Sequence, residues 1–354
     1  MATAPTTAPT APPDKKRIAP IKGKLKAPWR AFIYGPGGVG KSTLLADTEA
    51  PIFIDCEDGT GHLDVERYRW RDGLDGHVPR TFQEILDALT EIGTSPDYAH
   101  VKTLAIVGMG TLERLLWAHM LERDSTRGGM VNESKRKLKT IEDYGYNKGP
   151  TIALDLWTDF LAALDRCRAA RGCNVILEGH SIVRNFKNPA GEDYGRISLA
   201  INEKAAGLFI QAFEVIGYLS FEEWADTGND GKQRARGSGS GRRVLRTERS
   251  PVIDAKSRWP IPDDLEITEE RPWGAVARAI AEGQGATPQV IGTQIMAELD
   301  RISDQNLSAQ VKAACSKAKD DVMLLGRYLN SLRKRTAMPA SPPPQTTDDT
   351  PSQS

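Results

Sequence analysis

The sequence predicts an α/β fold in which a mainly parallel sheet carries helices on both faces. Two observations predict it. Apolar runs typical of buried strands alternate with helical patterns through the middle of the chain, and a glycine-rich nonapeptide joins the first run to a helix. Parallel strands are buried on both faces and are connected through helices, so this alternation favours a parallel sheet.

The individual elements follow from these runs. The parallel strands are expected at 31–34, 52–55, 103–107, 174–178 and 215–221. Two more polar runs, 242–248 and 251–255, are expected as antiparallel additions at the sheet edge. Helices are expected at 82–92, 112–122, 152–171 and 204–213, and helical patterns resume from Trp273 with a break at 283–287.

The ends of the chain differ in composition from its middle. Residues 1–27 are rich in Ala, Thr and Pro and then turn basic, and residues 337–354 are rich in Pro, Ser, Thr and Gln. Such segments bury too little apolar surface to fold, so we expect two disordered tails. Between them we expect a core over 28–270 and a helical appendage over 271–336.

Charge and cysteine content exclude several classes of protein. Lys plus Arg and Asp plus Glu both number 47, so only local basic patches could meet a polyanion. The cysteines form neither a Cys-x-x-Cys pair nor a His/Cys cluster, which argues against a zinc site or a disulfide framework. No apolar run resembles a signal peptide or a membrane span. We therefore expect a cytoplasmic protein without a membrane partner.

The nonapeptide is a phosphate-binding loop of the form G-x-x-x-x-G-K-[ST]. Its residues are Gly35, Pro36, Gly37, Gly38, Val39, Gly40, Lys41, Ser42 and Thr43. Glycines let successive backbone N–H groups point at phosphate oxygens. Lys41 is expected to reach the β- and γ-phosphates, and the Ser42 hydroxyl to bind Mg²⁺. The sequence thus predicts a nucleoside triphosphate site.

Two strand ends resemble segments of RecA-type recombinases. Residues 53–57 resemble the strand that carries their water-activating glutamate, which maps onto Glu57. Residues 174–181 resemble the next-to-last core strand, where a polar residue senses the γ-phosphate, here His180. Read without the resemblance, the acids after the second strand could instead cap a turn, and His180 could be a hydrogen-bonded structural residue.

A basic segment carries a further part of the resemblance. Residues 254–260 are similar to the Lys-Asn-Arg-Phe-Gly signature of RadA-type proteins, whose basic side chains reach the nucleotide of a neighbouring subunit. The resemblance therefore assigns catalytic roles to Lys256 and Arg258 beside those of Lys41. A solvated charged turn is the alternative.

Taken together, residues 28–265 resemble the AAA-type, RecA/RadA-like ATP-binding proteins of bacteriophages that accompany single-strand annealing and recombination. The resemblance implies an ATPase that forms ADP and phosphate, with ATP and Mg²⁺ as cofactors. It also implies single-stranded DNA as a partner and a homo-oligomeric ring or filament. A single-strand DNA-binding protein is a further candidate partner.

One position departs from that family. Its third strand should end in an aspartate that holds Mg²⁺ through water, but Val107 stands there. Valine accepts no hydrogen bond from metal-bound water, whereas Ser42 and the phosphates can still hold the ion. We therefore predict slow hydrolysis with nucleotide binding retained, unless Asp55 or Asp58 substitutes.

Two segments, 124–147 and 182–200, correspond to loops that hold single-stranded DNA in the RecA superfamily. Basic residues there could meet the DNA backbone, and aromatic rings could stack on bases. The candidate contacts are Arg136, Lys137, Arg184, Phe186, Lys187 and Arg196. A basic loop at 232–243 is a third candidate, and solvated loops without a ligand are the alternative for all three.

Three other functions compete with a DNA-dependent ATPase. A nucleotide-gated DNA-binding or assembly protein with little hydrolysis would suit Val107. A partitioning-type ATPase would suit residues 37–43, but that family needs a lysine at the position of Pro36. A small-molecule kinase would need an arginine-rich lid over its second substrate, which the sequence does not indicate beyond the basic loops.

Overall fold

The computed structural model describes residues 27–70, 76–126, 138–189, 191–226, 236–285, 287–302, 304–318 and 321–337. Within these ranges the strands are β1 (Arg30–Gly35), β2 (Pro51–Asp55), β3 (Glu66–Arg67), β4 (Thr103–Val107), β5 (Asn174–Phe186), β6 (Tyr194–Leu199), β7 (Val215–Asp226), β8 (Arg236–Arg246), β9 (Lys256–Ser257) and β10 (Asp264–Ile267). The helices are α1 (Lys41–Ala46), α2 (Phe82–Thr94), α3 (Met109–Thr126), α4 (Gly149–Arg171), α5 (Glu203–Ala212), α6 (Gly274–Gly285), α7 (Pro288–Leu299), α8 (Gln305–Ala318) and α9 (Val322–Ala337).

In the described residues these strands form a ten-stranded sheet in the order β10-β8-β7-β1-β5-β4-β2-β3, with β6 paired to β5 and β9 to β7. The six strands from β7 to β3 are parallel, and the others pair antiparallel. Parallel strands end at the same edge of a sheet. The segments that follow β1, β2, β4 and β5 therefore meet at one edge.

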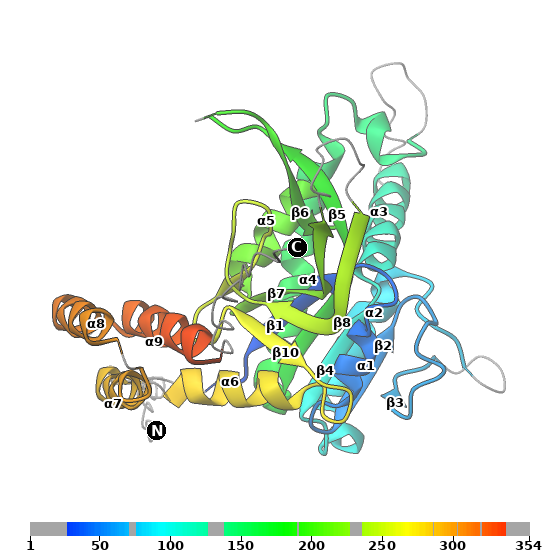
Figure 1. Ribbon diagram of the computed structural model, residues 1–354. Helices are drawn as coiled ribbons and strands as arrows, with labels where there is room; N and C mark the ends of the chain where they lie inside the picture. The colour runs from blue at the N-terminus through cyan, green and yellow to red at the C-terminus, as the bar shows by residue number, and fades with distance from the viewer. Residues whose placement is uncertain are drawn as a thin grey trace, which may run out of the picture.

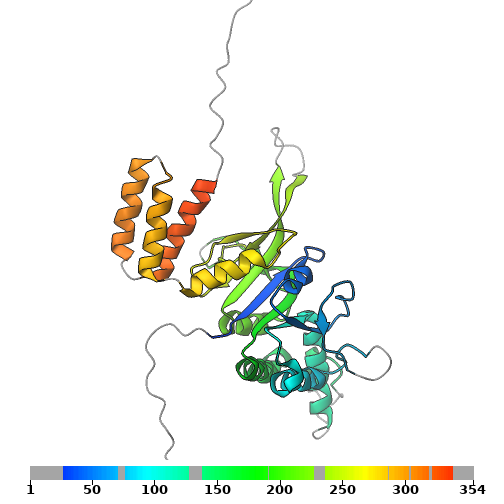
Figure 2. The same ribbon diagram turned by 90° about the horizontal axis from the view of Figure 1, so that it is seen from below.

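Alternate residues of β1 explain why the sheet is covered on both faces. Phe32 and Tyr34 belong to a core with residues of α2, α3, α4 and α5, whereas Ala31 and Ile33 belong to a second core with residues of α1 and α6. All four side chains are fully buried. Figure 2 shows α6 (yellow) on one side of the sheet and α2 and α4 (cyan and green) on the other. The predicted α/β class, a mainly parallel sheet with helices on both faces, is confirmed.

One predicted edge strand is wrong. β8 covers most of 242–248, but its second antiparallel partner is β10, not 251–255. The latter segment is attached to the core by other means: Asp254 accepts hydrogen bonds from the Ser198 hydroxyl at 2.5 Å and, through its carbonyl, from the Tyr34 hydroxyl at 2.5 Å. Pro251, which lacks an N–H group, is a poor ladder residue.

The C-terminal helices divide into two groups. Trp273, immediately before α6, stacks on Trp29 with ring centroids 5.9 Å apart, and α6 contributes Val276, Ala279 and Ile280 to the sheet core. In contrast, α7, α8 and α9 share a separate apolar cluster. Figures 1 and 2 show these three helices together beside α6. The predicted C-terminal helical region is confirmed, although its first helix packs on the sheet.

Glu113 of α3 supplies a pH-dependent contact inside the fold. Its carboxylate accepts the backbone N–H of Asn202 at 2.9 Å and 3.1 Å, which holds the segment before α5. Burial raises the pKa of Glu113 to about 7, against the opposing effects of the Asn202 hydrogen bond and the Arg184 charge. The folded protein therefore binds this proton more tightly than the unfolded chain does.

We predict that Glu113 makes stability fall as the pH rises. A raised carboxyl pKa contributes stability that is complete below the unfolded pKa and lost as the pH passes the folded pKa of about 7. The free energy of unfolding of Glu113→Gln, measured relative to that of wild type, should therefore rise by roughly 2 to 3 kcal/mol from pH 5 to pH 8. Urea unfolding at the two pH values measures this difference. A difference that does not change with pH contradicts the prediction.

Candidate functional site: a phosphate loop at the carboxyl edge of the sheet

The phosphate loop follows β1 and leads directly into α1. Gly40 takes a positive φ of 87°, which favours glycine, and a Cβ there would lie 2.6 Å from Nη1 of Arg243. No described side chain caps the amino end of α1. The loop can therefore offer backbone N–H groups to an anion, and no larger residue could replace Gly40 without moving Arg243.

Lys41 lies folded back over the loop. Its Nζ donates to the carbonyl of Pro36 at 2.9 Å and lies 3.2 Å from Oε1 of Glu178 on β5. Both side chains are almost completely buried. Burial raises the pKa of the Glu178 carboxyl above its usual value, and the Lys41 charge opposes that effect. The lysine predicted to reach the phosphates is thus held by a buried carboxylate.

Val107 ends β4 between two acidic residues. In the parallel register it pairs with Asp55 of β2 on one side and with Glu178 of β5 on the other. All three are buried, and Val107 packs in the core on the α1 side of the sheet. The position that lacks an acid therefore has a carboxylate on each neighbouring strand.

The two acids that sequence reasoning offered as substitutes are engaged elsewhere. Asp55 accepts hydrogen bonds from the Glu57 and Thr60 backbone N–H groups and from the Thr60 hydroxyl at 2.6 Å. Burial alone would raise the pKa of Asp55, but these bonds hold it below its usual value. Asp58 is exposed and pairs with Arg69 at 2.6 Å. Asp55 therefore shapes the turn after β2, as the capping alternative expected.

Glu57 and His180 meet at the same sheet edge. Oε2 of Glu57 lies 3.9 Å from Nε2 of His180, and Oε1 accepts the Thr111 hydroxyl at 3.0 Å. Gly108, with φ 86°, follows β4, and a Cβ there would lie 2.5 Å from Cγ of Glu57. Both side chains are partly exposed at the edge. A carboxylate and an imidazole are thus available beside the phosphate loop.

Lys256 and Arg258 lie at the opposite edge of the sheet. β9 pairs with the first residues of β7, and the two cations bind the carboxyl end of α5. Lys256 Nζ donates to the Ile210 carbonyl at 2.5 Å, while Arg258 donates to the Gln211 carbonyl at 2.8 Å and pairs with Glu214 at 3.2 Å. Within one chain they stabilise a helix end and do not approach their own phosphate loop.

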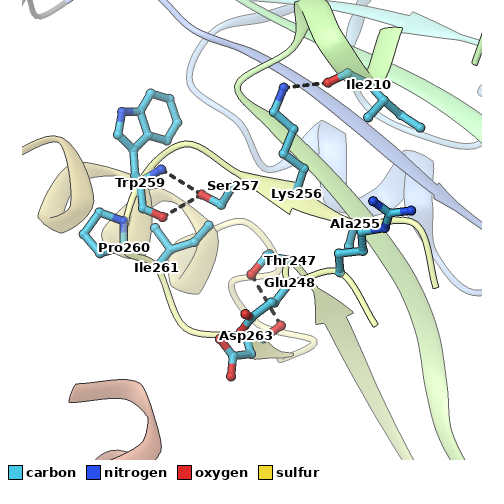
Figure 3. A pocket seen from close by; sticks show the side chains of 11 residues that line it. Ile210, Thr247, Glu248, Ala255, Lys256, Ser257, Trp259, Pro260, Ile261 and Asp263 are labelled. Atoms are coloured by element: carbon cyan, nitrogen blue, oxygen red, sulfur yellow. Dashed lines mark hydrogen bonds between the residues drawn. The ribbon is translucent and has the colours of Figure 1, made fainter. Parts of the chain in front are cut away.

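A pocket of about 330 Å³ adjoins this segment. Figure 3 shows Lys256 extending to the Ile210 carbonyl, the mutual hydrogen bonds of Ser257 and Trp259, and Thr247 bonded to Asp263. The pocket is lined by apolar residues such as Trp259 and Ile261 and by residues before β10. Because it lies away from the carboxyl edge, it is separate from the phosphate site.

The predicted DNA contacts differ in how accessible they are. Figure 1 shows β5 and β6 continuing past the sheet as a hairpin. Lys187 near its tip is exposed and pairs with Asp193 at 2.5 Å, and Arg184 donates to the Ile201 carbonyl. Phe186 is half-buried under Arg196. Arg136 and Lys137 lie outside the described residues, as do residues 232–235 of the predicted 232–243 loop. The rest of that segment, from Arg236, is not a loop but part of strand β8.

The structure assigns Arg196 to the packing of the hairpin, against the prediction of a DNA contact. Only 9% of Arg196 is exposed. Its guanidinium lies 3.7 Å from the centroid of the Phe186 ring and donates to the Pro251 carbonyl and the Tyr194 hydroxyl, both at 2.9 Å. A guanidinium so enclosed cannot meet a phosphate backbone without breaking these contacts.

Sequence reasoning missed three residues of the site. Glu178 was placed in a strand, but an acid at the end of an otherwise apolar strand was a usable signal. Thr111 and Arg243 gave no comparable signal, because their positions depend on α3 and on the pairing of β8. Arg243 of β8 reaches the phosphate loop beside Gly40 and donates to the Thr268 carbonyl at 3.4 Å.

The donor set suits an ion held mainly by phosphates. In the part of the chain that the structure describes, no group of three or more His, Cys, Asp and Glu side chains could hold a metal by itself. Mg²⁺ usually keeps several waters and takes one or two protein oxygens. The hydroxyl of Ser42, the residue after Lys41, and one carboxylate at this edge of the sheet fit that requirement.

Arg243 should strengthen binding of the phosphates. We predict that Arg243→Ala weakens ATP affinity by about tenfold, since a charge-assisted hydrogen bond is lost. Arg242→Ala is the matched control, because Arg242 is exposed and pairs with Glu266 at 3.3 Å. Isothermal titration of both variants measures the difference. Equal affinities in the two variants would show that Arg243 does not touch the nucleotide.

Comparison with known proteins gives a family for the chain. No curated protein matches the chain. In the described part of the chain, no helix has the length and apolar character that a membrane span requires. A solved structure of a RadB recombinase is similar, with a TM-score of 0.35 and 14% identity over 69% of this chain and 90% of that chain. Residues 27–259 match the family described as an AAA domain (AAA_24). Since that match spans well over half of the sequence, the chain belongs to this AAA-domain family.

Proposed function

We propose that the chain is a RecA-like ATPase that acts on single-stranded DNA in recombination, repair or strand annealing, as the bacteriophage proteins it resembles do. The observation that carries the proposal is the meeting of the phosphate loop with the Glu57–His180 pair at one sheet edge. Phosphoryl transfer to water needs a phosphate cradle, a group that orients water and a donor near the γ-phosphate. This edge offers all three.

Each residue then has a defined task. The loop backbone and Lys41 bind the β- and γ-phosphates, and Ser42 is a ligand of Mg²⁺, which neutralises phosphate charge when bound. Glu57 orients the attacking water and accepts its proton, and the Thr111 hydroxyl fixes the carboxylate that does so. His180, whose Nε2 lies 3.9 Å from Oε2 of Glu57, donates a hydrogen bond to a γ-phosphate oxygen.

The DNA part of the proposal depends on β5. Residues 174–180 of this strand lie in the sheet, and residues 181–186 continue into the hairpin with β6. In the hairpin, Val183 is 70% exposed, and Lys187 is exposed near the tip. A cation and an apolar surface suit a single strand, whose backbone is charged and whose bases are flat. Nucleotide contacts at His180 could therefore move the DNA surface.

Oligomerisation belongs to the same proposal. Arg258 remains partly exposed although it binds the end of α5, so a neighbouring subunit could place its nucleotide against this edge. The roles of Lys256 and Arg258 in catalysis require such a ring or filament.

A nucleotide-gated DNA-binding or assembly protein is the second candidate function. Val107 favours it, because the acid expected at the end of β4 is missing. Such a protein would bind ATP and DNA together with little turnover.

We predict that single-stranded DNA accelerates ATP turnover by this protein and that Glu57→Gln lowers turnover by at least about 100-fold while ATP still binds. The glutamine keeps the size of the side chain and removes its basic oxygen. Phosphate release with and without DNA, on material of determined mass, measures the effect. Nucleotide-dependent DNA binding without turnover would favour the second candidate instead.

Two lysines provide the DNA control. Lys187→Ala should reduce the stimulation by DNA and leave basal turnover unchanged, whereas Lys102→Ala should change neither. Lys102 is also exposed but precedes β4, at the opposite edge of the sheet. Equal stimulation in both variants would exclude the hairpin as the DNA surface.

A further inference from the structure

The end of β4 poses a chemical problem for a Mg²⁺-dependent nucleotide site. Val107 has no oxygen to offer, and the described residues contain no ready-made metal cluster. The strands on either side, however, place Asp55 and Glu178 in register with it. Register partners on parallel strands point to the same face, here the face of α1.

We propose that Glu178 replaces the missing carboxylate of β4 and accepts the hydrogen bonds of water bound to the nucleotide's Mg²⁺. The inference rests on the nucleotide binding in the proposed function and assigns its metal-holding residue. Glu178 is then a bifunctional group: it holds Lys41 and it holds the hydration shell of the ion.

Position favours Glu178 over the residue it replaces. β5 lies between β4 and β1, so Glu178 is one strand, about 4.8 Å, closer to the strand that carries the phosphate loop. Its carboxylate already reaches the loop, since Oε1 lies 3.2 Å from Lys41 Nζ. Ser42, the expected metal ligand, is the next residue along the chain. A carboxylate that reaches Lys41 is therefore beside the metal position.

The other acids of this edge are committed. Asp55 uses both oxygens to close the turn from Cys56 to Thr60. Glu57 is bound by Thr111 and faces His180 at the exposed rim. Asp58 is exposed and pairs with Arg69. Glu178 is the acid of this set whose charge is directed at the loop.

Burial strengthens the interactions of the Glu178 carboxylate with nearby charges and hydrogen-bond donors. Its side chain is only 6% exposed, and Oε2 accepts the backbone N–H of Gly108 at 3.4 Å. Charges interact more strongly where water is excluded. A carboxylate accepts about four hydrogen bonds, so capacity remains for metal-bound water when Lys41 turns to the phosphates.

The inference predicts opposite effects of one substitution in the absence and presence of Mg²⁺. In EDTA, Glu178→Gln should bind ADP at least as tightly as wild type, because Lys41 is released from its ion pair. Wild type should bind ADP more tightly with Mg²⁺ than in EDTA. The ratio of these two affinities should be about tenfold smaller in the variant. A loss of packing alone would weaken both affinities equally.

Val107 supplies the rescue. In Glu178→Gln/Val107→Asp the carboxylate returns to β4, and the Mg²⁺ gain should be restored. Val107→Asp alone should add little, because a second acid beside Glu178 is repelled. Isothermal titration with ADP avoids turnover, and melting temperatures check folding. Should Glu178→Gln fail to fold, Glu178→Asp keeps the charge on a shorter side chain and should lose part of the gain.

Two outcomes overturn the inference. Glu178→Gln with the full Mg²⁺ gain shows that another group holds the ion. A double variant without recovery shows that the ends of β4 and β5 are not interchangeable. If wild type binds no ADP in either condition, the proposed function itself fails, a result distinct from normal binding without an effect of Glu178.

Discussion

A buried ion pair joins the phosphate loop to the sheet, and the geometry of the site depends on it. Lys41 and Glu178 both lose their water, which is unfavourable unless each charge has a partner. The pair forms because β5 lies directly beside β1, so the strand order decides which carboxylate faces the loop. Any anion bound by the loop must therefore compete with Glu178 for Lys41, which makes this carboxylate part of the site.

The same strand connects the site to a distant surface. β5 carries Glu178 beside Lys41, then His180 beside Glu57, and then the hairpin with β6. Because His180 and Ser181 are consecutive residues of β5, a backbone shift at His180 would also displace the start of the hairpin. One strand thus joins the phosphate-loop edge of the sheet to the hairpin that we propose as the DNA surface.

Features that depend on short stretches of sequence could be predicted from the sequence alone. The apolar runs of β1, β2 and β4 were found because buried strands need them, and the phosphate loop because its glycines and lysine have fixed spacing. Long-range pairing could not be predicted in the same way. β10 takes the edge position predicted for 251–255, Arg243 reaches the loop from β8, and Arg196 is buried with its guanidinium over the Phe186 ring. Glu178 lies between these cases, since its chemistry was visible in the sequence but its register with Val107 was not.

The central claim is that the loop around Lys41 binds a triphosphate through its backbone and this one lysine. Calorimetric titration of ATP into the full chain and into Lys41→Met tests it most directly, since methionine keeps the length of the side chain and removes its charge. We expect wild type to bind with a single site per chain and the variant to lose most of that affinity. Equal binding by both proteins, or none by wild type, would contradict the account.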